Sequence, residues 1–354
     1  MSNNLGERYR VQIFGQSHSP RIGCVIEGIP AGVVPDMAFI RAFMARRAPG
    51  GPLSTARRET DEPVIVAGLN ERGETCGAPL CALIDNADAR PRDYDALRDV
   101  PRPGHADYPA AVKYGGHNDV RGGGQFSGRL TAPLCFAGAL ALQLLKDRGV
   151  WVRARVRRIG DEADAPVDFT HPPRDGLCAG PLPVVDPEAG RRMAEVIERA
   201  RSEGDSVGGV IECFAGGLPA GLGEPMFDGV ENRIARALFG IPAVRGVEFG
   251  AGFEAARMKG SAHNDAFRME GGRVVTRGNR HGGVLGGITT GMPLIVRAAF
   301  KPTPSIALRQ ASVSMSRGEG VSLAVEGRHD PCVVPRAVPV VEAAVACVLC
   351  DFML

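Results

Sequence analysis

Apolar residues recur every three or four positions in five stretches of the chain, a spacing that predicts helices with a buried face. The first stretch begins at Asp36, a residue type that caps helices well, and stops before Pro49. The second, residues 131–149, is rich in Ala and Leu on nearly all sides, which predicts a fully buried helix. The remaining predicted helices run from Asp186 to Gly204, from Asp228 to Gly240, and over residues 338–352.

Short runs rich in β-branched and apolar residues separate these helices and predict strands. The eight runs cover residues 11–14, 23–27, 63–67, 80–84, 151–156, 209–214, 244–249 and 294–300. Strands and buried helices do not alternate regularly, which argues against a doubly wound parallel sheet. We therefore predict a mixed α/β (α+β) fold in which sheets and helices are stacked in layers.

Two of the predicted strands end in similar sequences. Residues 27–32 (EGIPAG) and 216–221 (GGLPAG) each lie between a strand and an Asp-capped helix. The similarity fits a duplicated strand–turn–helix unit, but six residues also fit coincidence, and the sequence leaves both explanations open.

The bulk composition indicates one soluble unit. Glycine (47) and proline (27) are spread throughout and no linker-like stretch divides the chain, so residues 1–354 are predicted to form a single domain. The net charge of +2 gives no whole-molecule field that would attract nucleic acid or a membrane. The polar N-terminus carries no apolar signal region and no uninterrupted apolar run reaches about 18 residues, so we expect a cytoplasmic protein.

The cysteines favour reduced, buried thiols over a disulfide framework or a metal site. Their number, nine, is odd and their spacing is irregular. Cys347 and Cys350 form a single C-x-x-C pair without nearby histidine, which is weak support for zinc, and no metal is expected.

The basic residues are almost all arginine, since only four of the 42 are lysine. A GC-rich genome would explain this bias. Alternatively, some of the arginines bind carboxylates and phosphates, which a guanidinium grips in a bidentate way.

Histidine, arginine and glycine concentrate in five short segments. These are residues 14–19 (FGQSHS), residues 102–131, which contain RPGHADY and DVRGGG, residues 282–287 (GGVLGG), residues 301–305 (KPTPS) and residues 327–331 (GRHDP). Each segment alone also fits a structural turn. Together they place titratable side chains beside exposed glycine N–H groups and arginines, as a site for a polyanionic small molecule would require. The ATP-binding pattern G-x-x-x-x-G-K-[ST] is absent.

Two other functions each fit one feature of the sequence but lack a second. The segment from Gly250 to Ala255 matches the dinucleotide pattern G-x-G-x-x-A and follows a predicted strand, but Gly260 comes too soon for the crossover helix. An arginine-rich RNA-binding protein would need aromatic residues among the basic ones as stacking platforms, and aromatic residues make up only 5% of the chain.

The five segments, in this order, resemble the chorismate synthase family, and the similarity extends over essentially the whole chain. The family pattern after the triple glycine differs from residues 125–132 here (QFSGRLTA). The resemblance implies a β-α-β sandwich fold and assembly into a homotetramer. It also implies a lyase of aromatic amino acid biosynthesis (the shikimate pathway), which eliminates phosphate from 5-enolpyruvylshikimate 3-phosphate in an anti-1,4 sense to give chorismate. The resemblance implies a requirement for reduced FMN without net redox change, with NADPH or an external flavin reductase supplying the reduction.

The resemblance also assigns roles to residues. His18 would donate a proton near the flavin, His105 would protonate the leaving phosphate, and Asp330 would act as base on the flavin side. The predicted substrate contacts are Ser17, Arg47, Ser127, Arg129 and Arg328. The predicted cofactor contacts, those to NADPH included, are Arg47, Gln125, Phe126, Ser127, Pro242, Ala243, Gly286, Lys301, Pro302, Thr303, Pro304, Ser305 and Arg328.

Overall fold

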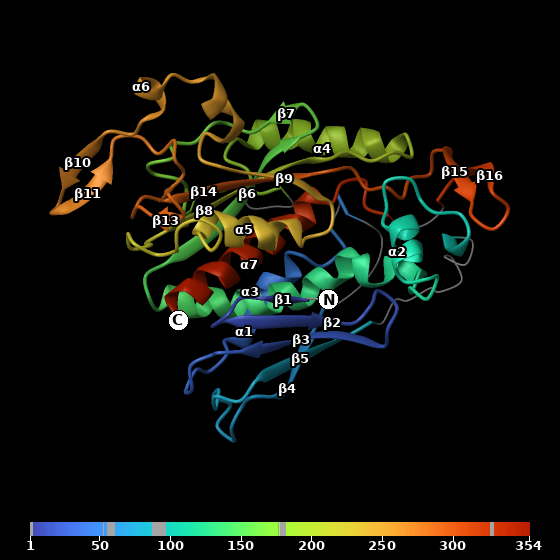
Figure 1. The fold of residues 1–354 in the computed structure, drawn as a ribbon, viewed down its shortest axis with the longest axis horizontal. Coiled ribbons are helices and arrows are strands. Elements are labelled where there is room, and N and C mark those ends of the chain that lie inside the picture. Colours follow the sequence, from blue (N-terminus) through green and yellow to red (C-terminus); the bar gives the residue numbers. More distant parts are fainter. Residues whose placement is uncertain are drawn as a thin grey trace.

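The computed structural model describes residues 3–51, 53–54, 61–86, 97–175, 177, 182–325 and 329–354. Two antiparallel sheets enclose a middle layer of helices, and a further helix covers the outer face of the second sheet (Figure 1). The predicted α+β sandwich is therefore confirmed. The first sheet has the strand order β1-β2-β3-β5-β4 and the second the order β7-β6-β8-β14-β9.

The eight predicted strands are the eight long strands of the two sheets. In the first sheet they are β2 (Arg10–Phe14), β3 (Arg21–Glu27), β4 (Pro63–Ala67) and β5 (Leu80–Asp85), and β1 (Asn4–Leu5) is added at one edge. In the second they are β6 (Trp151–Ile159), β8 (Gly209–Gly216), β9 (Val244–Phe249) and β14 (Leu294–Phe300), with β7 (Glu162–Ala163) at one edge. Three short hairpins were not predicted: β10–β11 (Phe267–Glu270, Arg273–Thr276), β12–β13 (Val284–Leu285, Ile288–Thr289) and β15–β16 (Gln310–Ser314, Glu319–Leu323).

The helices follow the predicted spans closely. α1 (Met37–Ala45) is capped by Asp36, whose side chain accepts from the Phe39 N–H, and α4 (Pro187–Ser202) is capped by Asp186. α3 (Thr131–Lys146) is buried along nearly its whole length. α5 (Val230–Phe239) begins two residues after Asp228, with Gly229 at its N-cap, and α7 (Val334–Met353) begins four residues earlier than predicted. The short helices α2 (Asp107–Lys113) and α6 (Gly260–His263) were not predicted.

The two sheets repeat one topology. In β2-β3-α1-β4-β5-α3 and in β6-β8-α5-β9-β14-α7, two strands precede a helix, and two more strands and a second helix follow. In both sheets the fourth strand lies between the second and the third. The strand–turn–helix similarity seen in the sequence thus belongs to a duplicated unit of four strands and two helices.

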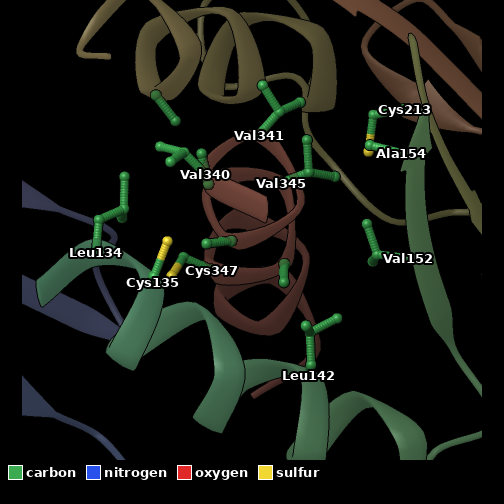
Figure 2. Close-up of a cluster of buried hydrophobic side chains, with 14 of the residues drawn as sticks. Leu134, Cys135, Leu142, Val152, Ala154, Cys213, Val340, Val341, Val345 and Cys347 are labelled. Atoms are coloured by element: carbon green, nitrogen blue, oxygen red, sulfur yellow. The ribbon is translucent and has the colours of Figure 1, made fainter. Parts of the chain in front are cut away.

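α3 and α7, the last helices of the two halves, pack against each other at the centre of the molecule (Figure 2). Cys135 of α3 lies beside Cys347 of α7, and Val345 of α7 points toward Val152 of β6 (Figure 2). The helices approach closely at Gly138, where an added Cβ would lie 2.2 Å from the Ala343 Cβ. A glycine is required there because any larger side chain would meet the partner helix.

The segment Gly128–Lys146 is long and apolar enough to cross a bilayer, with a mean hydropathy of 1.3. In the structure 83% of it is buried, chiefly against α7 and the first sheet. Its apolar character is that of a helix in the core of a folded protein.

Candidate functional site

A pocket of about 700 Å³ opens where α3 and α7 begin. Segments far apart in the sequence form its wall, among them the turn before α2, the glycine turn before α3, the loop between α5 and β9, and the loop after β14. Three of the five segments singled out in the sequence therefore meet here. The volume falls within the range of pockets that enclose most of a cofactor or drug-sized ligand.

Most of the predicted site residues line this pocket. They are His105, Asp330, Arg47, Ser127, Arg129, Gln125, Phe126, Pro242, Ala243, Lys301, Thr303, Pro304 and Ser305. Ser17, His18 and Pro302 are not among its lining residues. Ser17 and His18 lie beside Gly122, which lines the pocket, and Pro302 stands between the lining residues Lys301 and Thr303 in the chain. Gly286 lies in the β12–β13 turn, outside the lining, and Arg328 falls outside the described residues.

The pocket is strongly basic. Six cationic side chains line it, and Asp330 is the one carboxylate among the lining residues that the structure describes. The cations are Arg47, Arg102, Arg129, Arg245, Lys301 and Arg336. Burial, with the nearby charge of Arg245, lowers the pKa of Lys301 from its usual value. A ligand with several negative charges would relieve this crowding of positive charge.

Both central helices also point their positive ends at the pocket. α7 has Val333 at its N-cap and no side-chain cap, whereas α3 continues from the 3-10 helix Gly128–Leu130, whose N-cap Ser127 accepts from the Arg129 N–H. Thr131 and Val333 line the pocket. The positive ends of the two helix dipoles favour a bound anion.

Arg47 and Arg129 are held in the wall by a shared carboxylate. The Asp61 side chain is fully buried and accepts from the Nη1 atoms of both arginines. Arg47 Nε also donates to Thr131 Oγ1 at 3.0 Å, and Arg129 Nε to Asn86 Oδ1 at 2.7 Å. Burial raises the pKa of Asp61, but the two guanidinium groups outweigh burial and hold it below the usual range. Two arginines sharing one carboxylate leave a net positive charge at the pocket wall.

Three glycines separate the two predicted catalytic histidines. Gly122, Gly123 and Gly124 all have positive φ, between 54° and 85°. A Cβ on Gly122 would lie 2.4 Å from His18 Cε1, and one on Gly123 would lie 3.1 Å from His105 Nε2. The N–H of Ser17 donates to the Gly124 carbonyl at 3.0 Å. Only glycine allows this turn to pass between the two imidazole rings.

His105 belongs to a hydrogen-bonded cluster that sequence reasoning did not identify. Its Nδ1 lies 2.6 Å from Asp107 Oδ1, and Arg102 donates to both oxygens of the same carboxylate. Arg102 Nη1 also donates to Ser305 Oγ at 3.1 Å. Arg102 and Asp107 both lie inside the RPGHADY segment, so the motif itself pointed to this part of the chain. The sequence, however, does not show which side chains of a tight turn point inward.

Asp330 is likewise bound by an arginine. Arg336, six residues later in the first turn of α7, donates to Asp330 Oδ2 at 2.6 Å and to the Arg47 carbonyl at 2.9 Å. Arg336 therefore links the predicted base to the segment carrying a predicted substrate-binding arginine. The helix predicted from the sequence begins at residue 338, after Arg336, so the contact between Arg336 and Asp330 could not be foreseen.

The dinucleotide-binding alternative does not fit the fold. Gly250 to Ala255 follow β9, but β9 pairs antiparallel with β14 and the glycines lead into a 3-10 helix, Gly252–Arg257. The G-x-G-x-x-A pattern supports nucleotide binding only where a parallel strand continues into an α-helix. The motif here serves a close turn instead, because a Cβ on Gly250 would lie 2.1 Å from the Arg280 carbonyl oxygen.

The layered α+β fold thus presents a basic pocket whose charge suits an anionic small molecule. The chorismate synthase family model matches residues 9–354, so the chain belongs to the chorismate synthase family. Its relatives include the chorismate synthase of Thermococcus gammatolerans, 51% identical over 99% of this chain and 97% of the relative. That of Lancefieldella parvula is 44% identical over 99% and 96%. A solved structure entitled "Crystal Structure of Chorismate Synthase" superposes with a TM-score of 0.74 at 27% identity, covering 99% of this chain and 92% of that one.

The family resemblance of the motifs is therefore confirmed. With it the enzyme class is established as a lyase of aromatic biosynthesis.

Proposed function

We propose that this protein eliminates phosphate from 5-enolpyruvylshikimate 3-phosphate to form chorismate, and that it requires reduced FMN. The observation that carries the proposal is the net positive charge of the pocket: six cationic side chains line it, and of the residues that the structure describes only three carboxylates, Asp61, Asp107 and Asp330, pair with them. The substrate bears a phosphate and two carboxylates, so its charge complements this wall. The positive ends of the α3 and α7 dipoles add to the attraction for anions.

The residues predicted to hold the flavin fit a phosphate-bearing group. Thr303 Oγ1 is buried and has no hydrogen-bond partner within the described part of the chain, so a bound acceptor would satisfy it. Ala243 has a φ of 75°, which is strained for alanine, and its carbonyl accepts from the Lys301 N–H at 2.9 Å. When bound, reduced FMN would lend electron density to the breaking C–O bond without net oxidation.

The side chains of the chain itself would bind the substrate and handle the protons. Arg47 and Arg129 would hold anionic groups of the substrate, with Ser127 and Ser17 nearby. His105 would transfer a proton to the leaving phosphate oxygen, so that phosphate departs with less negative charge. His18 would hold a proton on the opposite side of the glycine turn, and Asp330, oriented by Arg336, would serve as base on the cofactor side.

The test is product formation under strict anaerobiosis with FMN reduced, oxidised or omitted. Chorismate is expected only with reduced FMN. Product formation without flavin, or none with reduced FMN, would contradict the proposal. A further arm with oxidised FMN and NADPH distinguishes a protein that reduces its own flavin from one that depends on an external reductase.

We also propose a homotetramer in the cytoplasm. Exposed apolar side chains support assembly: Phe267 and Met269 on the β10–β11 hairpin are 66% and 68% exposed, and Val64 and Val66 on edge strand β4 are 56% and 53% exposed. Light scattering should give four copies of the 37.3 kDa chain. A monomer at micromolar concentration would contradict this assembly.

A further inference from the structure

The turn that carries His105 contains a second ionisable side chain to which the proposed function assigns no role. Asp107, the first residue of α2, is only 6% exposed. Its Oδ2 accepts from the backbone N–H of Arg102 at 3.0 Å and from Arg102 Nε at 2.7 Å. Its Oδ1 accepts from Arg102 Nη2 at 2.8 Å and lies 2.6 Å from His105 Nδ1. One buried carboxylate thus orients both an arginine and a histidine of the pocket wall.

The chemistry of this contact fixes where His105 carries its hydrogen. Burial raises the pKa of Asp107, but the hydrogen bonds from Arg102 and His105 outweigh burial and hold it well below the usual range. An ionised carboxylate can only accept, so the 2.6 Å contact with Asp107 Oδ1 favours Nδ1 of His105 as the protonated nitrogen, over the longer 3.0 Å contact in which Arg102 Nη2 would donate to an unprotonated Nδ1. In the neutral ring Nε2 then carries the lone pair. Nε2 faces the glycine turn, 3.1 Å from where a Cβ on Gly123 would stand.

We propose that Asp107 is the positioning residue for His105. The proposal rests on the proposed function, in which His105 protonates the leaving phosphate. Asp107 holds His105 in the Nδ1–H form, so that Nε2 takes up the proton that the leaving group receives. As the C–O bond breaks, its electron pair goes to the phosphate oxygen. The Nε2 proton is transferred to that oxygen, and a neutral Nδ1–H imidazole remains.

Two further contacts keep this turn in place beside the loop predicted to contact the flavin. Arg102 Nη1 donates to Ser305 Oγ at 3.1 Å, and Lys301 Nζ donates to the Gly104 carbonyl at 2.6 Å. Arg102 Nη2 also lies 3.0 Å from His105 Nδ1. The negative charge of Asp107 is therefore shared between Arg102 and His105.

The first experiment reads the tautomer directly. Magic-angle-spinning ¹⁵N spectra of the full-length protein, labelled only at its seven histidines, are assigned for His105 with the His105→Ala variant. In the parent at a pH where the ring is neutral, Nδ1 should have the protonated-type shift and Nε2 the unprotonated-type shift. In Asp107→Asn this preference should be lost. An Nε2–H ring in the parent, or an unchanged spectrum in the variant, would overturn the proposal. The spectrum of the parent alone shows which nitrogen of His105 carries the hydrogen, even if the Asp107→Asn variant does not fold.

The second experiment is single-turnover phosphate release with reduced FMN. Asp107→Asn should slow release at least about tenfold, the lower end of the loss expected when a carboxylate partner of a functional histidine is removed. Affinities for substrate and FMN should stay within about threefold. The double variant His105→Ala, Asp107→Asn should be no slower than His105→Ala alone, because Asp107 acts through His105.

A matched control is the exposed pair Asp168 and His171, whose Nδ1–Oδ2 distance is 3.4 Å. Asp168→Asn should leave release unchanged, since both side chains lie on the surface. Release by Asp107→Asn within threefold of the parent, with His105→Ala slow, would refute the positioning role. If the parent forms no chorismate at all, the proposed function fails, and the ¹⁵N spectra still decide the Asp107 contact.

Discussion

Gly138→Ala is predicted to destabilise the protein although alanine favours helices. Alanine in place of a mid-helix glycine stabilises by up to about 1 kcal/mol. Against this, the new Cβ would lie 2.2 Å from the Cβ and 2.3 Å from the Cα of Ala343, both on the buried helix α7. These atoms belong to the backbone or lie next to it, so the two central helices must move apart.

Overpacking of this kind typically costs about 1–3 kcal/mol, and a clash with a helix backbone belongs at the upper end. We therefore expect a net loss of about 1–2 kcal/mol, which corresponds to a fall in melting temperature of a few degrees. Thermal unfolding of parent and variant at equal concentration measures it. The control is Gly260→Ala in α6, where a Cβ would meet no atom within 4 Å and stability should stay within about 0.5 kcal/mol. A Gly138→Ala protein as stable as the parent would show that the helices are not in close contact.

Three further predictions concern the site and the core. Arg129→Ala should weaken substrate binding by about 2–5 kcal/mol, because an anionic group of the substrate loses its guanidinium partner. A substrate affinity within threefold of the parent would show that Arg129 does not belong to the binding site. Cys347 and Cys350 should bind no metal, so the double variant Cys347→Ala, Cys350→Ala should have the same metal content as the parent and keep its activity. It should lose only packing stability, because burial raises the pKa of the Cys350 thiol to about 12, and stoichiometric zinc in the parent would contradict this. The free energy of unfolding should fall as the pH drops below about 4, since Asp61 and Asp107 have depressed folded-state pKa values and contribute stability that protonation removes. A urea midpoint that is flat between pH 5 and pH 3 would contradict the ion-paired geometry.

The main elements of the fold could be predicted from the sequence because they bury apolar faces of regular period. α3 is apolar on nearly all sides, and it lies between α7 and the first sheet. The boundary of α7 was placed too late because Pro339 lies inside the helix, where proline normally argues against one. The short hairpins were missed because β10 is exposed along its whole length and so carries no buried pattern.

The candidate site could be predicted only as a set of segments. The motifs identified His105, Asp330 and Lys301, which do line one pocket. Asp61 could not be foreseen, because its contact with Arg47 and Arg129 joins three separate segments and depends on a left-handed backbone with φ of 49°. Such contacts follow from the packing of the layers, which no local pattern specifies.

The most direct test of the account is a single anaerobic turnover with 5-enolpyruvylshikimate 3-phosphate and stoichiometric reduced FMN. Chorismate and inorganic phosphate should appear together in equal amounts, and the flavin should have the absorbance spectrum of reduced FMN when the reaction is complete. Phosphate release without chorismate, or chorismate formation accompanied by stoichiometric oxidation of the flavin, would contradict the account.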